Sequence, residues 1–508
     1  MRKIISLLVI FVLMLFPFKT LAFEVPEQIR VGLFYGSKAK SEYSVTINEG
    51  AKITGGGGTF IAEDIAVTSL TAKTDSFFHA VLDTQFETQD EAWECVSLLK
   101  ENGILAFYML DGSHFRVYAG LFETEEDAQN TKDTIISLGF DCEIYAPNPL
   151  SVVVFSGTNP WVGSVSSGLR IYPLSESFKL GEKEYRGCIE FYRDEKSDMA
   201  AVNVLDIDEY LMGVVPKEVS PSWNVEALKA QAIVARTYAV TNLNKFQSYG
   251  FNVDDTTQSQ VYGGKSAEYD STNQAVLETS GQYVLYDGKP AEVFFYSSSG
   301  GMTENVENVW GGASKPYLVS VPDIYENPDE ASHYRWTAEF SPEDIKMKLS
   351  ASGIDIGDIL DMTIDEASLS GRSLKTTIYG TTGTHTSKFS NIRSLLGLYS
   401  NCFTISREGG ETPTIFILSK DGKTTKSPDG LSVISKNGKA VLGASVSVLG
   451  KDGLKTYAKT NGTGNFVLSG KGYGHGIGMS QWGAKGMADA GFSYKEIITH
   501  YFKGTEVS

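Results

Sequence analysis

Cysteine is scarce in this chain. Four cysteines occur among 508 residues: Cys95, Cys142, Cys188 and Cys402. None of them forms a C-x-x-C pair or lies close to a histidine, so the sequence contains no zinc-ligand motif. The four thiols are expected to form one or two disulfides or to be small core residues. We predict no metal and no other cofactor.

Positive charge is also in short supply. The chain carries 44 Lys and Arg against 62 Asp and Glu, a net charge of -18. Nucleic acids and anionic lipid surfaces are both bound through cationic side chains, so these two kinds of partner are disfavoured. With 42% hydrophobic and 21% charged residues, the composition is that of a globular protein with two or three domains.

Only one long hydrophobic run is present. The run IISLLVIFVLMLF follows Arg2 and Lys3, and TLA ends at Ala22 as a small-residue cleavage site does. We therefore predict a signal peptide over residues 1–22 and a secreted or cell-envelope protein. The leader has no cysteine to carry a lipid, and no second run is long enough to cross a bilayer. Membrane attachment would require an uncleaved leader.

Phosphate-binding glycine motifs are missing, although the segment GKGYGHGIGMSQWGAKG (residues 470–486) is rich in glycine. Neither G-x-G-x-x-G nor G-K-[ST] can be placed on it. Alternating glycines instead suit a strand and loop to which another chain, or a flat sugar ring, comes close. His475 would orient such a ring by a hydrogen bond, with Ser480 and Gln481 as further donors and acceptors. Trp482 is either a stacking platform for a pyranose or a core aromatic.

An internal repeat lies in the first half of the chain. TQFETQDEAWECVSLLKENGILAFYML and AGLFETEEDAQNTKDTIISLGFDCEIY share the pattern F-E-T-x-[DE]-[DE]-A, a helical period and a glycine turn. Each half follows a predicted strand, so residues 76–146 should form two strand-helix-strand units in a small four-stranded, ferredoxin-like sheet. This segment resembles the SPOR domains, which bind peptidoglycan strands that lack stem peptides. An unrelated ferredoxin-like spacer is the alternative. Residues 23–75 before it are predicted to be an N-terminal β segment.

The segment from residue 200 to 243 predicts two helices. Asp206 and Glu209 have the spacing of a capping box ahead of a short helix over residues 207–215, which Pro216 should end. The run VEALKAQAIVARTYAVTNL then predicts an alanine-rich helix with one closely packed face. Glu218 would lie in the connection between these helices, where a carboxylate can point into a cleft.

Several segments of the second half occur in the order found in one protein family. They are YRGCIEF, VNVLDIDEYLMGVVPKEV, EALKAQAIVARTYAV, QVYGG, YSSSGGMTENVENVWGG, PYLVSV and GYGHGIGMSQWGAKGMADAGFSYKEIITHYFKGTEV. In these the chain resembles the SpoIID/LytB family of bacterial cell-wall proteins, which implies such a domain over residues 150–508. Asp-Gly and Asn-Gly turns between about 405 and 468 predict hairpins in a β-rich insertion within it. The predicted fold class is α+β.

The resemblance implies a function for Glu218. The sporulation branch of the family contains lytic transglycosylases, whose catalytic acid lies in the segment that here reads GVVPKEV. They cut the MurNAc-GlcNAc bond of stem-peptide-free glycan and leave a 1,6-anhydro end, so one carboxylate suffices where most glycosidases need two. The alternative is a non-catalytic peptidoglycan-binding protein that activates a cell-wall amidase. Without the motif, Glu218 would be interpreted as a surface charge or a helix cap.

Further candidates for glycan contacts follow from the same resemblance. They are Gln231, Arg236 and Tyr238 on the alanine-rich helix, and Ser297, Ser298 and Ser299 in YSSSGG. The serines either bond sugar hydroxyls or satisfy their own turn. Some sporulation members carry cysteine and histidine around this turn and bind zinc. This chain has serines there and no nearby histidine, which again predicts no metal.

Arg236 is open to two interpretations. A buried guanidinium can hold the lactyl carboxylate of MurNAc through two parallel hydrogen bonds. It can also form a structural salt bridge to Asp206, Asp208 or Glu226.

Overall fold

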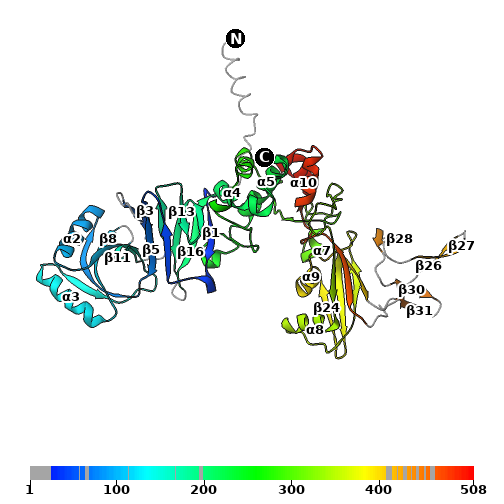
Figure 1. Ribbon diagram of the computed structural model, residues 1–508, viewed down its shortest axis with the longest axis horizontal. Coiled ribbons are helices and arrows are strands. Elements are labelled where there is room, and N and C mark those ends of the chain that lie inside the picture. The colour runs from blue at the N-terminus through cyan, green and yellow to red at the C-terminus, as the bar shows by residue number, and fades with distance from the viewer. Residues whose placement is uncertain are drawn as a thin grey trace, which may run out of the picture. The chain divides into compact units, whose positions relative to one another are not determined.

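The computed structural model describes residues 25–508 apart from twelve short gaps: 56–57, 63–67, 112–113, 166–167, 194–197, 408–414, 420–421, 427–431, 436–437, 442–445, 451–452 and 458–463. The predicted signal peptide lies outside the described residues. Helices and several separate sheets are present (Figure 1), which confirms the α+β class. All four cysteines are free and buried, so they are core residues and not disulfides. Two compact units follow each other along the chain, residues 27–281 and 282–508.

A seven-stranded sheet in the unit 27–281 leads into the candidate catalytic segment. Its order is β17 (Val253–Asp254), β1 (Gln28–Phe34), β16 (Ala200–Asp206), β15 (Cys188–Tyr192), β12 (Leu169–Pro173), β3 (Ala51–Gly55) and β4 (Gly58–Ala62). β1 pairs with β16 although about 170 residues separate them in the sequence. The first strand of the chain therefore lies beside the strand that precedes Glu218.

A ten-stranded sheet contains the repeated segment. Its order is β14 (Lys183–Arg186), β13 (Ser177–Leu180), β2 (Glu42–Thr46), β5 (Ser69–Thr74), β10 (Val152–Ser156), β11 (Asn159–Ser164), β7 (Ala106–Asp111), β8 (His114–Phe122), β6 (Phe78–Phe86) and β9 (Cys142–Tyr145). The repeat forms the predicted units β6-α2-β7 and β8-α3-β9, with α2 at Gln89–Glu101 and α3 at Glu125–Ser137. The expected isolated four-stranded sheet is wrong, because β7 also pairs with β11 and the sheet continues.

The shared pattern F-E-T-x-[DE]-[DE]-A has a local physical reason. Thr88 and Thr124 cap α2 and α3, accepting hydrogen bonds from the backbone N–H groups of Glu91 and Asp127. The alanine that ends each pattern is fully buried. The helices cover one face of the strands (Figure 1). A hydrophobic cluster that reaches across to β10 covers the other face: Val81, Phe107, Met109, Tyr118, Val153 and Phe155.

Three helices follow the seven-stranded sheet: α4 (Ile207–Glu218), α5 (Val225–Thr241) and α6 (Asp270–Glu278). Asp206 caps α4 as predicted, accepting a hydrogen bond from the N–H of Asp208. The predicted end at Pro216 is wrong, since α4 continues to Glu218 and the Val219 N–H still reaches the Val215 carbonyl. A proline in the last turn removes one N–H donor without preventing the turn from closing.

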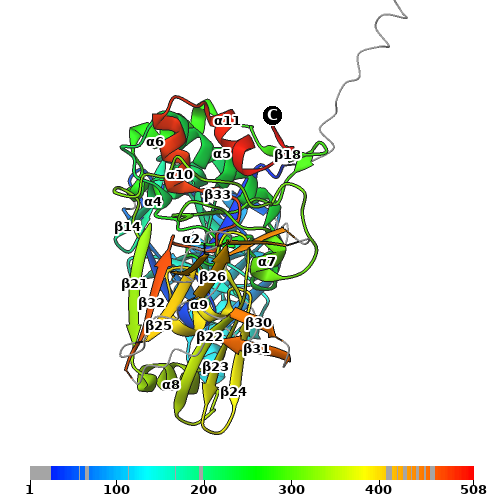
Figure 2. The ribbon, with the colours of Figure 1, turned by 90° about the vertical axis from the view of Figure 1, so that its right-hand side faces the viewer.

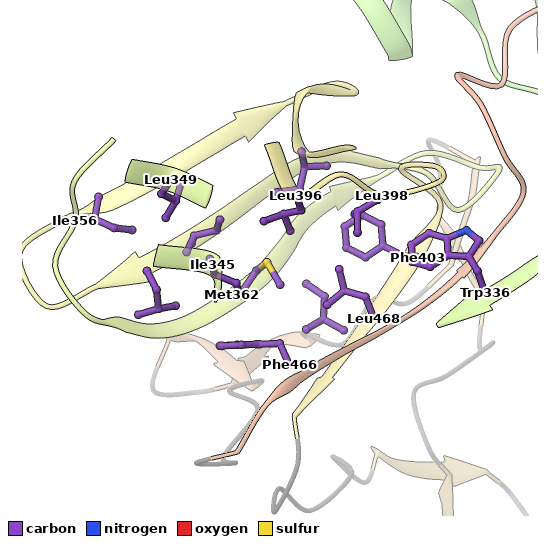
Figure 3. Packing of buried hydrophobic residues seen from close by; sticks show 14 residues of the cluster. Trp336, Ile345, Leu349, Ile356, Met362, Leu396, Leu398, Phe403, Phe466 and Leu468 are labelled. Carbon is purple, nitrogen blue, oxygen red and sulfur yellow. The ribbon is translucent and has the colours of Figure 1, made fainter. Parts of the chain in front are cut away.

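The unit 282–508 is built around a second core. One sheet has the order β21 (Arg335–Phe340), β32 (Phe466–Lys471) and β25 (Phe403–Arg407), side by side in Figure 2, and another joins β22 (Ile359–Ala367), β23 (Ser373–Gly380) and β24 (Thr384–Lys388). The helices α8 (Pro342–Ala351) and α9 (Asn391–Leu396) accompany them. Figure 3 shows the apolar cluster that these elements share, with Trp336 and Phe403 at one end.

Three hairpins lie between β25 and β32, which confirms the predicted hairpin chemistry. They pair β26 (Ile415–Ser419) with β27 (Gly422–Lys426), β28 (Ser432–Ser435) with β29 (Gly438–Val441), and β30 (Val446–Gly450) with β31 (Gly453–Tyr457). Because β25 and β32 are themselves paired, the chain leaves and re-enters the core at adjacent strands.

The remaining elements of this unit bring its sequence motifs together. They are β18 (Val284–Tyr286), β19 (Lys289–Pro290), β20 (Phe295–Tyr296), α7 (Val306–Trp310), β33 (Met479–Ser480), α10 (Gln481–Asp489), α11 (Tyr494–Tyr501) and β34 (Glu506–Val507). β20 runs parallel to β33, so the YSSSGG turn lies against the SQW segment. Among the described residues, no helix is both long and apolar enough to span a membrane.

Candidate functional site

Glu218 is the last residue of α4, and the backbone of a distant segment fixes its carboxylate. Its Oε1 accepts a hydrogen bond of 3.0 Å from the N–H of Val261. Val261 belongs to the motif QVYGG, and the residues 254–264 around it form a loop that we call the 254–264 loop. The carboxylate is partly buried, and Val215 and Val219 beside it in the chain are buried. The sequence marked QVYGG as a family motif, but its contact with Glu218 was not predicted.

Three further contacts hold the 254–264 loop against the helices. The N–H of Gly263 donates to the carbonyl of Gly213 in α4 at 3.0 Å. The hydroxyl of Tyr210 donates to Gln260 Oε1 at 3.3 Å, and Gln260 Nε2 donates to the carbonyl of Ala235 in α5. A side chain at Gly213 would collide with Tyr262, since its Cβ would lie 2.5 Å from the ring. The Val261 N–H that donates to Glu218 is therefore held in place by the two helices that the loop contacts.

Tyr238 and Gln231 lie on α5, the second helix of this site. Burial, followed by the charges of Tyr238 and Glu218, raises the pKa of Tyr210 well above 10, so these three groups share one electrostatic environment. Lys245 donates to the Tyr238 hydroxyl at 3.1 Å. Gln231 is 1% exposed, and within the described structure no protein group pairs with its amide nitrogen or oxygen. Both residues remain candidates for glycan contacts.

Arg236 forms a structural salt bridge, which was the alternative to the predicted glycan contact. It is 1% exposed, and its Nε and Nη2 donate to Asp208 Oδ1 at 2.9 and 2.7 Å. Its remaining contacts go to the carbonyls of Thr279 and Val276 at the end of α6. The guanidinium thus joins α4, α5 and α6. These bonds leave it engaged by the protein, which speaks against the predicted grip on a lactyl carboxylate.

The serines of the YSSSGG turn and of the SQW segment meet each other in the unit 282–508. The backbones of Ser298 and Tyr473 exchange two hydrogen bonds of 3.0 and 2.8 Å, and the Ser297 carbonyl accepts from the N–H of Trp482. Ser480 caps α10, accepting from the N–H of Gly483. Ser298, Ser299, Ser480 and Gln481 are all buried. Ser299 accepts from the N–H of Gly301 and Ser480 caps a helix, so both satisfy the local backbone, whereas the amide nitrogen of Gln481 has no partner among the described residues.

Two buried carboxylates beneath this turn were not predicted. Glu326 Oε2 accepts hydrogen bonds from the hydroxyl and N–H of Ser299 and from the N–H of Gly300. Asp323 accepts from the Tyr501 hydroxyl at 2.9 Å. Burial raises the pKa of Asp323, while burial and the charge of Asp323 raise the pKa of Glu326. No His, Cys, Asp or Glu cluster of three that could hold a metal occurs in the described part of the chain.

His475 orients its own loop and does not reach outwards. Its Nε2 donates to the carbonyl of Phe295 at 3.1 Å, and its Nδ1 accepts from the N–H of Ile477 at 3.1 Å. Burial, aided by the positive charges of Arg393 and Arg372, lowers the pKa of His475 to about 3. The ring is therefore neutral near pH 7 with both nitrogens used by the backbone. His475 therefore orients the backbone of the protein itself, and not a sugar ring as predicted.

A pH prediction follows for His475. The unfolded chain takes up a proton at this residue below about pH 6.5, whereas the folded chain stays neutral until about pH 3. The free energy of unfolding should therefore fall as the pH drops from about 6.5 to about 3, by about 1.4 kcal/mol per pH unit at most. We expect His475→Gln to remove this slope. Urea unfolding at several pH values, followed through labelling of the buried Cys402 by a pyridyl disulfide, measures it. Equal slopes in both chains would contradict the assignment.

The alternating glycines allow other parts of the same protein to pack closely against their backbone. Gly472 has φ +77, and a Cβ there would lie 2.6 Å from the Ser298 carbonyl oxygen. At Gly476, with φ +90, it would lie 2.5 Å from the Arg372 guanidinium carbon. Three other glycines are contacted in the same way: Gly470 by Trp336, Gly474 by Tyr296 and Gly478 by the Phe294 carbonyl. Close approach was predicted correctly, but the chain's own residues occupy the space expected for a sugar ring.

Gly472→Ala tests this close approach. Gly491 is a matched control, because it also has a positive φ of +92 but nothing lies within 4 Å of a Cβ there. Gly491→Ala should lower the free energy of unfolding by about 1 kcal/mol, through the left-handed backbone alone. Gly472→Ala should cost about 1–3 kcal/mol more through the clash. Urea dependence of Cys402 labelling would show the difference, and equal costs would refute the packing argument.

Comparisons with known proteins place the chain in a family. A family model described as stage II sporulation protein (SpoIID) matches residues 195–286, and a model of a domain of unknown function (DUF8618) matches residues 325–422. Stage II sporulation protein D of Bacillus amyloliquefaciens is 30% identical over 330 residues, covering 61% of this chain and 76% of that protein. The amidase enhancer of Bacillus subtilis (strain 168) is 33% identical over 350 residues, covering 66% of this chain and 46% of that protein. An uncharacterised protein of Brachyspira hyodysenteriae is 33% identical over 349 residues, covering 68% and 78%.

These similarities define a class of protein with a cell-wall-related function. The chain belongs to the SpoIID/LytB family, which contains stage II sporulation protein D and the amidase enhancer. The model for stage II sporulation protein covers β16, α4, the 254–264 loop and α6, so the matched segment is the one that fixes Glu218.

Proposed function

We propose that this protein is a peptidoglycan lytic transglycosylase with Glu218 as its single acid and base, acting outside the cytoplasm on glycan strands that lack stem peptides. The observation that carries the proposal is the fixed carboxylate of Glu218, held at 3.0 Å by the N–H of Val261. The position of Glu218 within residues 195–286, which the family model matches, supports it. A general acid or base must be positioned before its acidity matters, and both α4 and the 254–264 loop provide that positioning.

The chemistry needs one carboxyl group in two protonation states. Protonated Glu218 donates its proton to the glycosidic oxygen as the bond from that oxygen to the anomeric carbon of MurNAc breaks. The 6-hydroxyl oxygen of the same MurNAc then bonds to the anomeric carbon, and the carboxylate takes the hydroxyl proton. Glu218 is the last residue of α4 and is held by the Val261 N–H, so one carboxyl group is in place for both proton transfers.

Product analysis tests the proposal. The full chain is incubated with peptidoglycan from which an amidase has removed the stem peptides, and soluble products are analysed by mass spectrometry. Glycan fragments that end in 1,6-anhydroMurNAc are the expected result. Fragments with reducing ends would indicate hydrolysis by water, and intact strands would indicate that the chain does not cleave glycan.

A second candidate function has its own observation. The similarity to an amidase enhancer supports a non-catalytic role in which this chain binds glycan and stimulates a cell-wall amidase. The SPOR-like segment at residues 76–146 fits both candidates as a proposed glycan-binding module. Stimulation of an added amidase without any anhydro products would favour this second function.

A further inference from the structure

Two exposed rings and one partly buried ring gather on the unit 282–508 from three distant parts of its sequence. His333 and Tyr399 are stacked with ring centroids 3.9 Å apart and planes 29° apart. Tyr473 meets both rings edge-on, at 5.4 Å from Tyr399 and 5.1 Å from His333. Tyr399 and Tyr473 remain 38% and 39% exposed. We call His333, Tyr399 and Tyr473 the aromatic shelf.

The aromatic shelf is anchored to the core beneath it. Tyr399 packs on Trp336, at 5.9 Å between centroids, and Trp336 lies at the end of the apolar cluster in Figure 3. The Trp336 indole N–H donates to the carbonyl of Gly472, and the N–H of Gly474 donates to the carbonyl of Tyr399. The backbone of Tyr473 is therefore held on both sides, at Gly472 and at Gly474.

His333 has an unusual backbone conformation. Its φ is +57, a left-handed conformation that is uncommon for residues other than glycine. Such a conformation costs about 1–2 kcal/mol and persists where the surroundings maintain it, which is frequent at functional sites. The conformation places the imidazole on the ring of Tyr399, where it extends the shelf.

An arginine without an acidic partner lies beside the aromatic shelf. Arg393 donates through Nε to the carbonyl of Tyr399 at 3.1 Å. No carboxylate forms an ion pair with it among the described residues, and no described acceptor bonds its two Nη atoms. Burial lowers the pKa of Arg393, and the like charge of Arg372 adds to that effect. A half-buried guanidinium in this setting gains by binding an anion.

We propose that the aromatic shelf and Arg393 form a binding subsite for a pyranose that bears a carboxylate, the N-acetylmuramic acid unit of a glycan strand. The choice of peptidoglycan as the polymer rests on the proposed function. The C–H face of a pyranose is apolar and packs on the negative face of an aromatic ring. The lactyl carboxylate would then accept hydrogen bonds from the two Nη atoms of Arg393. A neutral N-acetylglucosamine unit has the same ring but lacks the anion.

A ligand modification tests the subsite without altering the protein. Soluble stem-peptide-free strands are titrated into the full chain by calorimetry, beside the same strands with their lactyl carboxylates converted to methylamides. The titrations use the Glu218→Gln chain, so that the strands stay intact. We expect the amidated strands, and the neutral polymer chitohexaose, to bind about tenfold more weakly, as loss of a charge-assisted contact predicts. Equal affinity for the charged and amidated strands would overturn the proposal.

Two substitutions locate the subsite. Arg393→Gln should weaken binding of the natural strands about tenfold and remove the preference for them over amidated strands. Tyr473→Ala should weaken both ligands alike, because stacking does not depend on the charge. Lys346→Gln removes an equal charge from the exposed surface of α8 and should change neither. Protection of the Cys402 thiol shows that each variant is folded.

The outcomes of this test and of the product analysis are separable. If the wild-type chain releases no anhydro products while the Glu218→Gln chain discriminates between charged and amidated strands, the subsite stands and the transglycosylase proposal fails. If products are released while the two kinds of strand bind equally, the enzyme stands and the subsite fails.

Discussion

Glu218→Gln should abolish the release of 1,6-anhydroMurNAc ends, lowering the rate of product formation by about 10²–10⁴-fold. Glutamine has nearly the shape of glutamate and can still accept a hydrogen bond from the Val261 N–H. It can neither donate an acidic proton to the glycosidic oxygen nor take one from the 6-hydroxyl. The loss would therefore come from the chemistry and not from a disturbed loop. Mass spectrometry of the products over time measures it.

Glu278→Gln is the matched control for this experiment. Glu278 lies at the end of α6 in the same unit and forms a surface ion pair with Lys229 at 2.7 Å. The same change of charge and shape there should leave product release unchanged. Undiminished release by the Glu218→Gln chain would exclude Glu218 as the acid, and equal loss in both variants would point to general destabilisation.

Arg236→Met should lower the free energy of unfolding of the unit 27–281 by about 3–5 kcal/mol. The substitution leaves Asp208 without its cationic partner and removes the donors that satisfy the carbonyls of Val276 and Thr279. Unpaired buried polar groups of this kind carry the largest costs of single substitutions. The expected result is structural, and it contrasts with a role in sugar binding, which would weaken glycan affinity in a chain of normal stability.

The buried cysteine thiols allow this loss in the free energy of unfolding to be measured. Cys95, Cys142 and Cys188 lie in the unit 27–281, and Cys402 lies in the unit 282–508. Labelling at increasing urea concentration, read by mass spectrometry of peptides, reports the unfolding of each unit separately. Lys229→Gln is the control on the same helix, and the loss of its surface pairs should cost at most about 1 kcal/mol. A similarly small cost for Arg236→Met would show that the ion pair does not stabilise the unit.

Local chemistry made much of the fold predictable. Thr88 and Thr124 repeat at the start of two helices because each caps its own helix, and the hairpins between β25 and β32 follow from their turn residues. Asp206 likewise caps α4. The end of α4 was misplaced at Pro216, since the cost of one lost N–H donor was overestimated in a last turn that tertiary packing supports.

Long-range pairing explains what the sequence left open. The partner of Glu218 is a backbone N–H at Val261, and a backbone group has no signature in the sequence. The choice for Arg236 between a ligand and Asp208 depended on where α6 packs. His475 and Ser480 carried the right chemistry, yet their partners lie in the same motif or about 180 residues away. Tyr399 and Arg393 had no motif at all and are recognised through their neighbours.

The strand order of the ten-stranded sheet affects how the SPOR-like segment would act in the proposed enzyme. Its strands belong to the same hydrogen-bonded sheet as β11 and β10. The segment is therefore not a separate domain on a flexible linker, whose effective concentration would fall with linker length. A glycan strand bound there would be presented to Glu218, in the same unit, at one reach and one angle. If the proposed glycan binding and the proposed cleavage both hold, such an arrangement should produce fragments of narrower length distribution than a flexible linker would.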